Sequence, residues 1–283
     1  MNDSSLFLKL NNQLYDLRTP VVMGILNVTP DSFFMRSRFK TDRTLLQQVE
    51  QFLKDGASII DIGGYSTRPQ AAPVPVDDEI KRIAEALESI SKKFPEAIIS
   101  VDTFRSPVAR MAVEQFRVAM INDISGGTLD PQMFETVADL GVAYVLMHTR
   151  GTPQNMQVNT DYDDMVSEVL QFLQKRVAQL HMLGVNDVVI DPGFGFAKTM
   201  DQNYELLSKL SYFQEINVPI LAGLSRKSMI YKLLNTDPEG ALNGTTAVNM
   251  LALMGGASIL RVHDVKEAVE TIKIFSEYRK MKE

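Results

Sequence analysis

The chain has 283 residues, of which 45% are hydrophobic and 23% charged, a composition typical of a globular protein with one large domain or two. It contains no Cys, which excludes disulfides, thiolate metal sites and a cysteine nucleophile, and its 3 His argue against a multi-His zinc site. The formal net charge of -6 argues against nucleic acid or an anionic membrane as a partner and, taken alone, against an anionic substrate. The sequence has no apolar run of about 18 residues that would predict a transmembrane helix, and residues 1–5 lack the basic region of a signal peptide, so we expect a cytoplasmic protein.

The first residues predict a β-hairpin, and repeating βα units follow it. Two short apolar runs, residues 6–10 and 14–17, flank an Asn-rich turn, so we assign residues 1–19 to an N-terminal hairpin appendage. From Val21 onward, short β-branched runs alternate with stretches of helical period, which places residues 20–283 in one βα domain. The predicted strands are residues 21–26, 58–62, 98–101, 118–121, 142–147, 188–190, 219–222 and 258–260.

This alternation predicts the class of fold. The helices between the strands are amphipathic; Ile83, Leu87 and Ile90, for example, fall on one helical face. Repeated βα units with continuous apolar strands are typical of a closed parallel barrel or of an open, doubly wound sheet. Because eight strands and this length fit the (β/α)8 TIM barrel, we expect that α/β fold, with its active site at the carboxyl ends of the strands.

Each predicted strand is followed by a polar or charged residue. Taken singly, such residues are ordinary strand ends, because loops are polar. Taken together at one end of a barrel, they indicate a binding site. Asp102, Asn122 and Asp191 suit a flat heterocycle with several N–H donors, because carboxylates and amides can pair with such an edge. In chain order, the residues at the strand ends are Asn27, Asp61, Asp102, Asn122 with Asp123, His148, Asp191, the run from Gly223 to Ser228, and Arg261 with His263.

A second group of residues at this end is cationic. Its members are Arg68, Lys227, Arg261 and His263. Phosphate or diphosphate is their natural partner, and barrels often bind phosphate near strands seven and eight. We therefore expect the mouth to divide into a heterocycle region and an anion region. A Mg²⁺ ion held mostly by diphosphate oxygens fits this chemistry, with Asn27 placed as a protein ligand.

Seven motifs in order resemble the signatures of the dihydropteroate synthase family. The resemblance covers about residues 20 to 275, and although each motif alone is weak, the ordered set at matching barrel positions is specific. The motifs are residues 23–33 (MGILNVTPDSF), 61–69 (DIGGYSTRP), 100–103 (SVDT), 121–124 (INDI), 191–196 (DPGFGF), 223–228 (GLSRKS) and 261–265 (RVHDV).

The resemblance implies a transferase of folate synthesis that is a target of sulfonamides. Such an enzyme joins 6-hydroxymethyl-7,8-dihydropterin diphosphate to 4-aminobenzoate, giving 7,8-dihydropteroate and diphosphate, and is usually a homodimer. The diphosphate would leave first, helped by Mg²⁺ and the cations. Asp102 and Asp191 would then stabilise the pterin CH2 cation until the neutral amine attacks it.

The resemblance also assigns roles to individual residues. The catalytic residues would be Asp102, Asp191, Lys227 and Arg68. The pterin would be bound by Asp102, Asn122, Asp191, Lys227, Met147, Phe196 and Gly223. The diphosphate would be bound by Asn27, Thr67, Arg68, Arg261 and His263, with Asn27 also at the Mg²⁺. The 4-aminobenzoate or a sulfonamide would contact Phe33, Thr67, Pro69, Phe196, Lys227 and Ser228.

Four segments depart from the family pattern. Residues 34–37 (FMRS) stand where Ser-Asp-Gly-Gly is usual, Tyr65 replaces a frequent Glu, and Ala197 replaces a Gly. Thr149 and Arg150 follow His148 where Met is usual. None of these residues belongs to the pterin set, so we expect effects on loop closure or sulfonamide affinity. Two alternatives stay open: a methyltetrahydrofolate-dependent corrinoid methyltransferase on the same barrel, and a catalytically inactive homologue.

Overall fold

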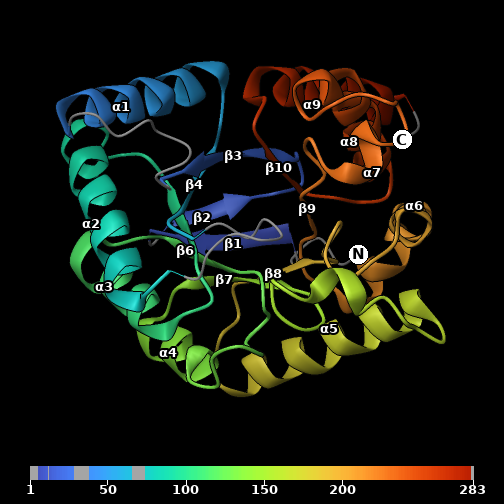
Figure 1. Cartoon of the computed structure of the whole chain (residues 1–283), viewed down its shortest axis with the longest axis horizontal. Helices are drawn as coiled ribbons and strands as arrows, with labels where there is room; N and C mark the ends of the chain where they lie inside the picture. Colours follow the sequence, from blue (N-terminus) through green and yellow to red (C-terminus); the bar gives the residue numbers. More distant parts are fainter. Residues whose placement is uncertain (1–5, 12, 29–37, 66–73, 282–283) are drawn as a thin grey trace.

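The computed structural model describes residues 6–11, 13–28, 38–65 and 74–281. Within them, eight parallel strands form one sheet in the order β8-β7-β6-β5-β4-β3-β10-β9 (Figure 1). The two end strands meet as well, because Ile190 pairs in parallel with Ile220 and its amide donates to the Pro219 carbonyl over 2.9 Å. The predicted closed barrel is therefore confirmed over the open sheet. The strands are β3 (Val21–Asn27), β4 (Ile59–Gly63), β5 (Ile99–Asp102), β6 (Met120–Asp123), β7 (Ala143–Met147), β8 (Val188–Asp191), β9 (Leu221–Ala222) and β10 (Ile259–Val262).

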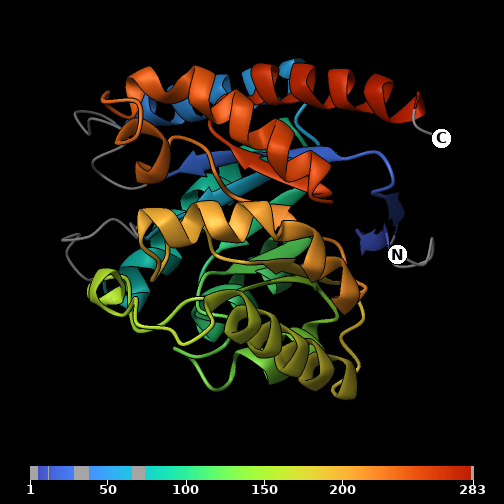
Figure 2. The ribbon, with the colours of Figure 1, turned by 90° about the vertical axis from the view of Figure 1, so that its right-hand side faces the viewer.

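The helices surround this barrel and cover its outer face (Figures 1 and 2). Each presents an apolar stripe to the strands; α2, for example, buries Ile83, Leu87 and Ile90, as its sequence predicts. Every helix in the described ranges is too short or too polar to cross a membrane. The α-helices are α1 (Arg38–Asp55), α2 (Val76–Lys93), α3 (Ser106–Phe116), α4 (Met133–Leu140), α5 (Met165–Met182), α6 (Met200–Ser208), α7 (Ser228–Tyr231), α8 (Leu242–Met254) and α9 (Val265–Lys280).

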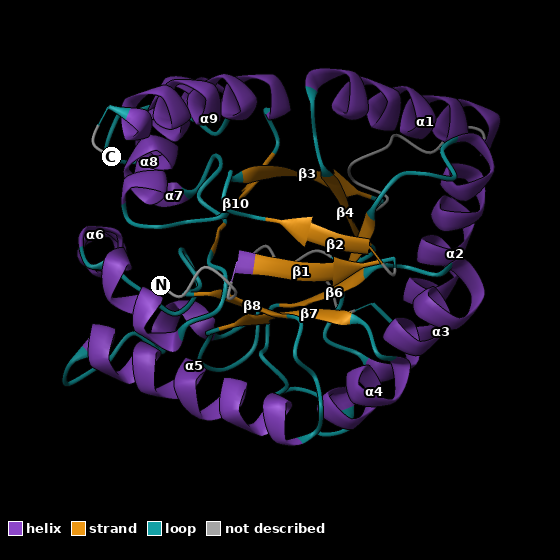
Figure 3. Cartoon of the chain, turned by 180° about the vertical axis from the view of Figure 1, so that it is seen from behind, coloured by secondary structure: helices purple, strands orange, loops and turns teal. Residues whose placement is uncertain are grey.

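The predicted N-terminal hairpin is also confirmed. Strands β1 (Phe7–Leu10) and β2 (Gln13–Asp16) pair in antiparallel fashion and lie across one opening of the barrel (Figure 3). Leu8, Leu10 and Leu17 are buried against residues inside the barrel, such as Met120 and Val189. Burial of each leucine contributes about 1.5–3 kcal/mol of hydrophobic free energy. The amino-terminal end of the barrel is therefore filled with apolar side chains, which leaves polar chemistry to the other end. The division into residues 1–19 and 20–283 stays a prediction.

Most strands end one or two residues later than expected. Asp61, which we grouped with the strand-end residues although the predicted strand 58–62 contains it, is the third residue of β4, and it is completely buried. Side chains alternate between the two faces of a strand, so Asp61 shares the barrel interior with Ile59 of the apolar core. The structure thus places inside the barrel a carboxylate that we had grouped with the polar residues of the mouth.

Candidate active site

The strand register brings the predicted polar residues to one level of the barrel. Asn27 pairs with Gly63, Gly63 with Asp102, and Asp102 with Asn122. A Cβ built on Gly63 would lie 3.5 Å from Asn27 Oδ1 and 3.8 Å from Asp102 Oδ2, so the absence of a side chain leaves these two oxygens facing the same space. Further round the barrel, Met147 pairs with Asp191.

Arg261 lies at the centre of the first group of polar side chains. Its Nε donates to Asp61 Oδ2 over 2.6 Å, and its Nη2 donates to Asp102 Oδ2 over 2.7 Å. Asn122 Nδ2 donates to the same Asp61 oxygen over 2.9 Å. The other oxygen of Asp61 is buried and has no hydrogen-bond partner within the described residues. We call Asp61, Asp102, Asn122 and Arg261 the arginine cluster.

Burial and charge work against each other in the arginine cluster. Burial raises the pKa of Asp102 to about 7; Arg261 opposes this rise, and the Asp61 carboxylate adds to it. For Arg261, burial disfavours the charged form, but the two carboxylates outweigh burial and raise its pKa above the ordinary value. Arg261 therefore stays charged, while Asp102 changes its charge near neutral pH.

Asp191 and Lys227 form a second group of charged side chains, beside Gly223. A Cβ built on Gly223 would lie 3.6 Å from Asp191 Oδ2 and 4.0 Å from Lys227 Nζ. Because glycine has no side chain, the space beside both charged groups is left open. Lys227 Nζ donates to the Phe194 carbonyl and lies 4.7 Å from the centroid of the Phe196 ring. We call Asp191, Gly223, Lys227 and Phe196 the lysine cluster.

Burial shifts the pKa values of both charged members of the lysine cluster. It lowers the pKa of Lys227 to about 8, against the opposing effect of the Asp191 carboxylate. It raises the pKa of Asp191, against the effects of Lys227 and of the Gly193 amide, which donates to Asp191 Oδ1 over 2.8 Å. Each group thus stabilises the charged form of the other.

His263 and Ser228 lie at the rim of the site. His263 is exposed, and its Nδ1 lies 3.0 Å from Ser225 Oγ. Ser228 is the first residue of α7. Arg226 donates to Asp264 from Nε over 2.9 Å and from Nη2 over 2.7 Å, which ties the segment after β9 to the segment after β10.

The structure corrects the expected division of the mouth into two chemical regions. Carboxylates and cations alternate instead: Arg261 lies between Asp61 and Asp102, and Lys227 lies beside Asp191. This arrangement follows from the interior position of Asp61, which gives Arg261 a second carboxylate partner. Four predicted site residues, Phe33, Thr67, Arg68 and Pro69, fall outside the described residues, as does the atypical segment 34–37.

A buried glutamate supports the site from outside and was missed in the sequence. Glu79 of α2 accepts from Thr103 Oγ1 and from Arg105 Nη1, each over 2.7 Å. The Arg105 guanidinium in turn lies 5.2 Å from the centroid of the Tyr65 ring, whose hydroxyl accepts from Gln154. Burial raises the pKa of Glu79. A charged residue four positions before Ile83, on the apolar stripe of α2, was the signal that could have revealed it.

Comparisons with known proteins identify the family. The family model described as "Pterin binding enzyme" matches residues 23–263. Dihydropteroate synthase of Escherichia coli (strain K12) is 43% identical over 264 residues, which are 92% of this chain and 92% of that protein. Dihydropteroate synthase of Haemophilus influenzae is 41% identical, over 94% of this chain and 96% of the relative.

Solved structures give the same result. Dihydropteroate synthase of Yersinia pestis in complex with a sulfonamide drug superposes with a TM-score of 0.89 at 38% identity, covering 97% of this chain and 99% of the other. The enzyme of Xanthomonas albilineans with 4-aminobenzoic acid gives 0.88 at 38% identity, covering 97% and 98%. The chain therefore belongs to the pterin-binding enzymes and, within that family, to the dihydropteroate synthases.

Proposed function

We propose that the arginine and lysine clusters together condense 6-hydroxymethyl-7,8-dihydropterin diphosphate with 4-aminobenzoate to give 7,8-dihydropteroate and diphosphate. The observation that carries this function is the pairing of buried or partly buried acceptors with partly buried cations at one end of the barrel, around Gly63 and Gly223, which carry no side chain. A flat, donor-rich ring with an anionic tail matches such a surface. Solved structures of the Xanthomonas albilineans enzyme contain 4-aminobenzoic acid or 6-chloroguanine, and the latter is a flat ring of this kind.

The pterin ring would lie against Gly223, between the two clusters. Asp102, Asn122 and Asp191 present oxygens for its N–H donors, and the Lys227 ammonium can donate to a ring acceptor. Met147, which is 3% exposed at the end of β7, would border the ring on the apolar side. Removing such a ring from water strengthens each of these hydrogen bonds, because the surrounding residues are buried.

The diphosphate would extend from the ring toward the rim. Arg261 and the exposed His263 supply cationic or N–H contacts there, and Asn27 faces the same space across Gly63. A bound Mg²⁺ fits Asn27 together with diphosphate oxygens, because this ion takes one or two protein oxygens and completes its shell with phosphate and water. When bound, the ion would neutralise charge on the departing diphosphate.

The bond between the pterin CH2 carbon and the diphosphate oxygen would break first, and its electron pair would leave with the diphosphate. Positive charge then spreads from the CH2 carbon into the ring, where the carboxylates of Asp102 and Asp191 stabilise it. The nitrogen lone pair of 4-aminobenzoate forms the new C–N bond, and the nitrogen releases a proton. An aromatic amine is nucleophilic in its neutral form, so this step needs no strong protein base.

The second substrate would bind nearer the rim than the pterin. Phe196 offers a ring face beside Lys227, and Ser228 at the start of α7 is placed for the 4-aminobenzoate carboxylate. A sulfonamide, which is bound in the Yersinia pestis structure, would compete here. Phe33, Thr67, Arg68 and Pro69 keep their predicted roles from the family resemblance.

Diphosphate release tests the proposed function. Purified protein is given the pterin diphosphate and Mg²⁺; continued release over many turnovers should require 4-aminobenzoate and should fall when a sulfonamide is present. Tight pterin binding without release would instead identify an inactive homologue. Methyl transfer from methyltetrahydrofolate to a corrinoid would identify the alternative methyltransferase.

We also propose a homodimer in the cytoplasm. The large apolar side chains of Leu251 and Met254 on α8 are about half exposed, at 51% and 54%, and would gain from burial against a second copy. Size-exclusion chromatography with light scattering tests the dimer, and a monomeric mass would contradict it.

A further inference from the structure

The turn between β8 and α6, residues 192–199, carries two groups of the lysine cluster. The Phe194 carbonyl accepts from Lys227, and the Phe196 ring packs beside the same ammonium. Three residues of the turn have positive φ: Gly193 at 76°, Gly195 at 78° and Ala197 at 49°. Glycine adopts this conformation freely, whereas the Cβ of alanine makes it unfavourable. The turn therefore needs contacts from outside to hold Ala197 in its place.

Lys198 provides the first of these contacts. It is 4% exposed, and its Nζ lies 3.0 Å from the Gly193 carbonyl, 3.1 Å from the Phe196 carbonyl and 3.1 Å from His148 Nδ1. Burial lowers the pKa of Lys198 to about 7, against the opposing effect of the Asp191 carboxylate; in its charged form, its three N–H groups match the three acceptors. Burial and the nearby Lys198 lower the pKa of His148 well below its ordinary value, which leaves a neutral ring that can accept. Lys198 thus ties both ends of the turn to the end of β7.

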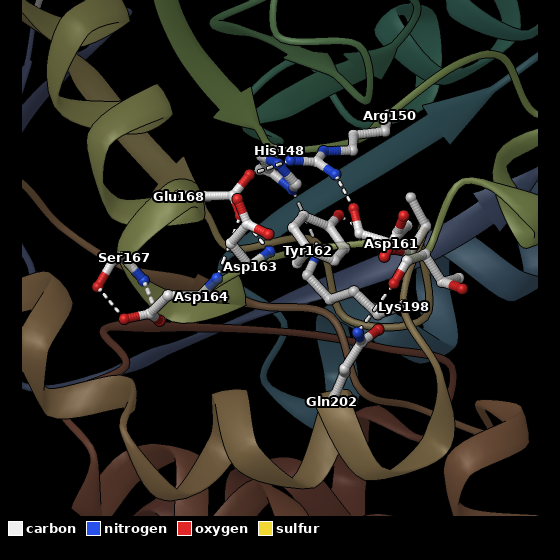
Figure 4. A network of polar contacts seen from close by, with 12 residues as sticks. His148, Arg150, Asp161, Tyr162, Asp163, Asp164, Ser167, Glu168, Lys198 and Gln202 are labelled. Carbon is white, nitrogen blue, oxygen red and sulfur yellow. Dashed lines mark hydrogen bonds and ion pairs between the residues drawn. The ribbon is translucent and has the colours of Figure 1, made fainter.

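Tyr162 provides the second contact. Its hydroxyl donates to the Ala197 carbonyl over 2.9 Å, so it holds the residue with the unfavourable backbone conformation. The Arg150 guanidinium lies 3.7 Å from the centroid of the Tyr162 ring and is itself held by Glu168 and by the Asp161 carbonyl (Figure 4). Two of the departures from the family pattern, Arg150 and Ala197, therefore meet in one network.

We propose that Arg150, Tyr162 and Lys198 are positioning residues, which hold the 192–199 turn so that Phe196 and the Phe194 carbonyl face Lys227 in the substrate site. This inference rests on the proposed function and adds residues that touch neither substrate. It predicts that loosening the turn weakens 4-aminobenzoate binding more than pterin binding. The reason is that Phe196 moves with the turn, whereas the pterin keeps its contacts with Asp102, Asn122 and Arg261 on the strands even where Lys227 shifts.

Tyr162→Phe is the mildest test, because it removes one hydroxyl and keeps the ring under Arg150. Loss of one hydrogen bond should raise KM for 4-aminobenzoate about fivefold. The Kd for the pterin diphosphate should rise by a smaller factor, because of the pterin contacts only those of Lys227 and Phe196 depend on the turn. The matched control is Tyr212→Phe, which removes a hydroxyl from a tyrosine that is 56% exposed and lies outside the turn. Its kinetics should equal those of the unmodified protein.

Rescue separates a positioning role from a general loss of stability. In the Tyr162→Phe background, Ala197→Gly relieves the positive φ and should return KM for 4-aminobenzoate toward its original value. No recovery, or Tyr162→Phe kinetics equal to those of Tyr212→Phe, would overturn the inference. If the unmodified protein releases no diphosphate, the proposed function fails instead.

Hydrogen exchange tests the turn independently of turnover. Amides in the peptide spanning 192–199 should exchange faster in Tyr162→Phe than in Tyr212→Phe, while amides of β4 and β5 should not change. Equal exchange in the two variants would refute the positioning role even in a protein without activity.

Discussion

Arg261 and Lys227 are both cations at the carboxyl end of the same barrel, but the partners of Arg261 lie on strands, whereas those of Lys227 lie mainly on a loop. The partners of Arg261 are Asp61 and Asp102, side chains of β4 and β5 whose positions the strand register determines. Lys227 is held mainly from the 192–199 turn, through the Phe194 carbonyl and the Phe196 ring. The arginine cluster thus shares the stability of the sheet, whereas the lysine cluster depends on loop contacts.

The largest effect should follow from removing the arginine. Arg261→Met leaves two buried carboxylates without their cation, which should lower the free energy of unfolding by about 3–5 kcal/mol. The loss should be smaller at pH 5 than at pH 8, because the remaining carboxyls can then take up protons. Urea unfolding at both pH values measures this. Arg110→Met, which breaks exposed ion pairs, is the control and should cost about 1 kcal/mol or less. Similar losses in the two variants would show that the strands do not depend on Arg261.

Lys227→Ala should act on binding more than on stability. Loss of the buried charge beside Asp191 should weaken the pterin diphosphate by about 100-fold, measured by calorimetry, since truncating one member of a buried charge pair costs about 2–5 kcal/mol. The barrel should still unfold in one cooperative transition, because the lysine lies outside the strands. Unchanged affinity would mean that Lys227 has been assigned the wrong role.

Asp102 should make pterin affinity depend on pH. Burial raises the pKa of Asp102 to about 7, and only the ionised carboxylate offers both oxygens to N–H donors. Affinity for 6-hydroxymethyl-7,8-dihydropterin, which lacks the titrating diphosphate, should therefore rise with pH by up to about tenfold per unit below that pKa and level off above it. Asp102→Asn should flatten the curve, and it should slow turnover more than it weakens 4-aminobenzoate binding. A pH profile that is the same in both proteins would exclude Asp102 as the titrating group.

The smallest effect belongs to the turn itself. Ala197→Gly removes an unfavourable positive φ but adds glycine flexibility to the unfolded chain, so the net gain in the free energy of unfolding should be at most about 1 kcal/mol. Thermal unfolding measures it, with Ala138→Gly as the matched control inside helix α4, where the same change should destabilise. A loss of stability at Ala197 would show that the turn is not strained.

The sequence predicted the barrel, because apolar strands and amphipathic helices can be recognised from local pattern, and the number of strands, eight, is that of a closed barrel. It also predicted Asp102, Asn122 and Asp191, because a parallel barrel gathers strand ends whatever their distance along the chain. Asp61 was grouped with the strand-end residues, although the predicted strand 58–62 contains it; the structure shows it as the third residue of β4 (Ile59–Gly63). The alternation of side chains along that strand makes it an interior carboxylate.

Hydrogen bonds from side chains to nearby backbone carbonyls could not be predicted from the sequence. Lys198 reads as a surface residue in the sequence, and only the folded turn shows that its ammonium is surrounded by carbonyls. Arg150 and Ala197 stood out as departures from a family pattern, but nothing in their spacing indicated that Tyr162 connects them. Such contacts depend on rotamers and loop paths, which local periodicity does not determine.

The leucines of the N-terminal hairpin have a consequence for the order of events in turnover. Leu8, Leu10 and Leu17 close the end of the barrel opposite the site. Both substrates and both products must therefore pass through the opening at the carboxyl ends of the strands. The pterin lies deeper than the second substrate in the proposed arrangement, and it must therefore enter first. The joined product, anchored by its pterin, must leave last. Because the base of the barrel is closed, the depth at which each substrate binds sets the order in which substrates enter and products leave.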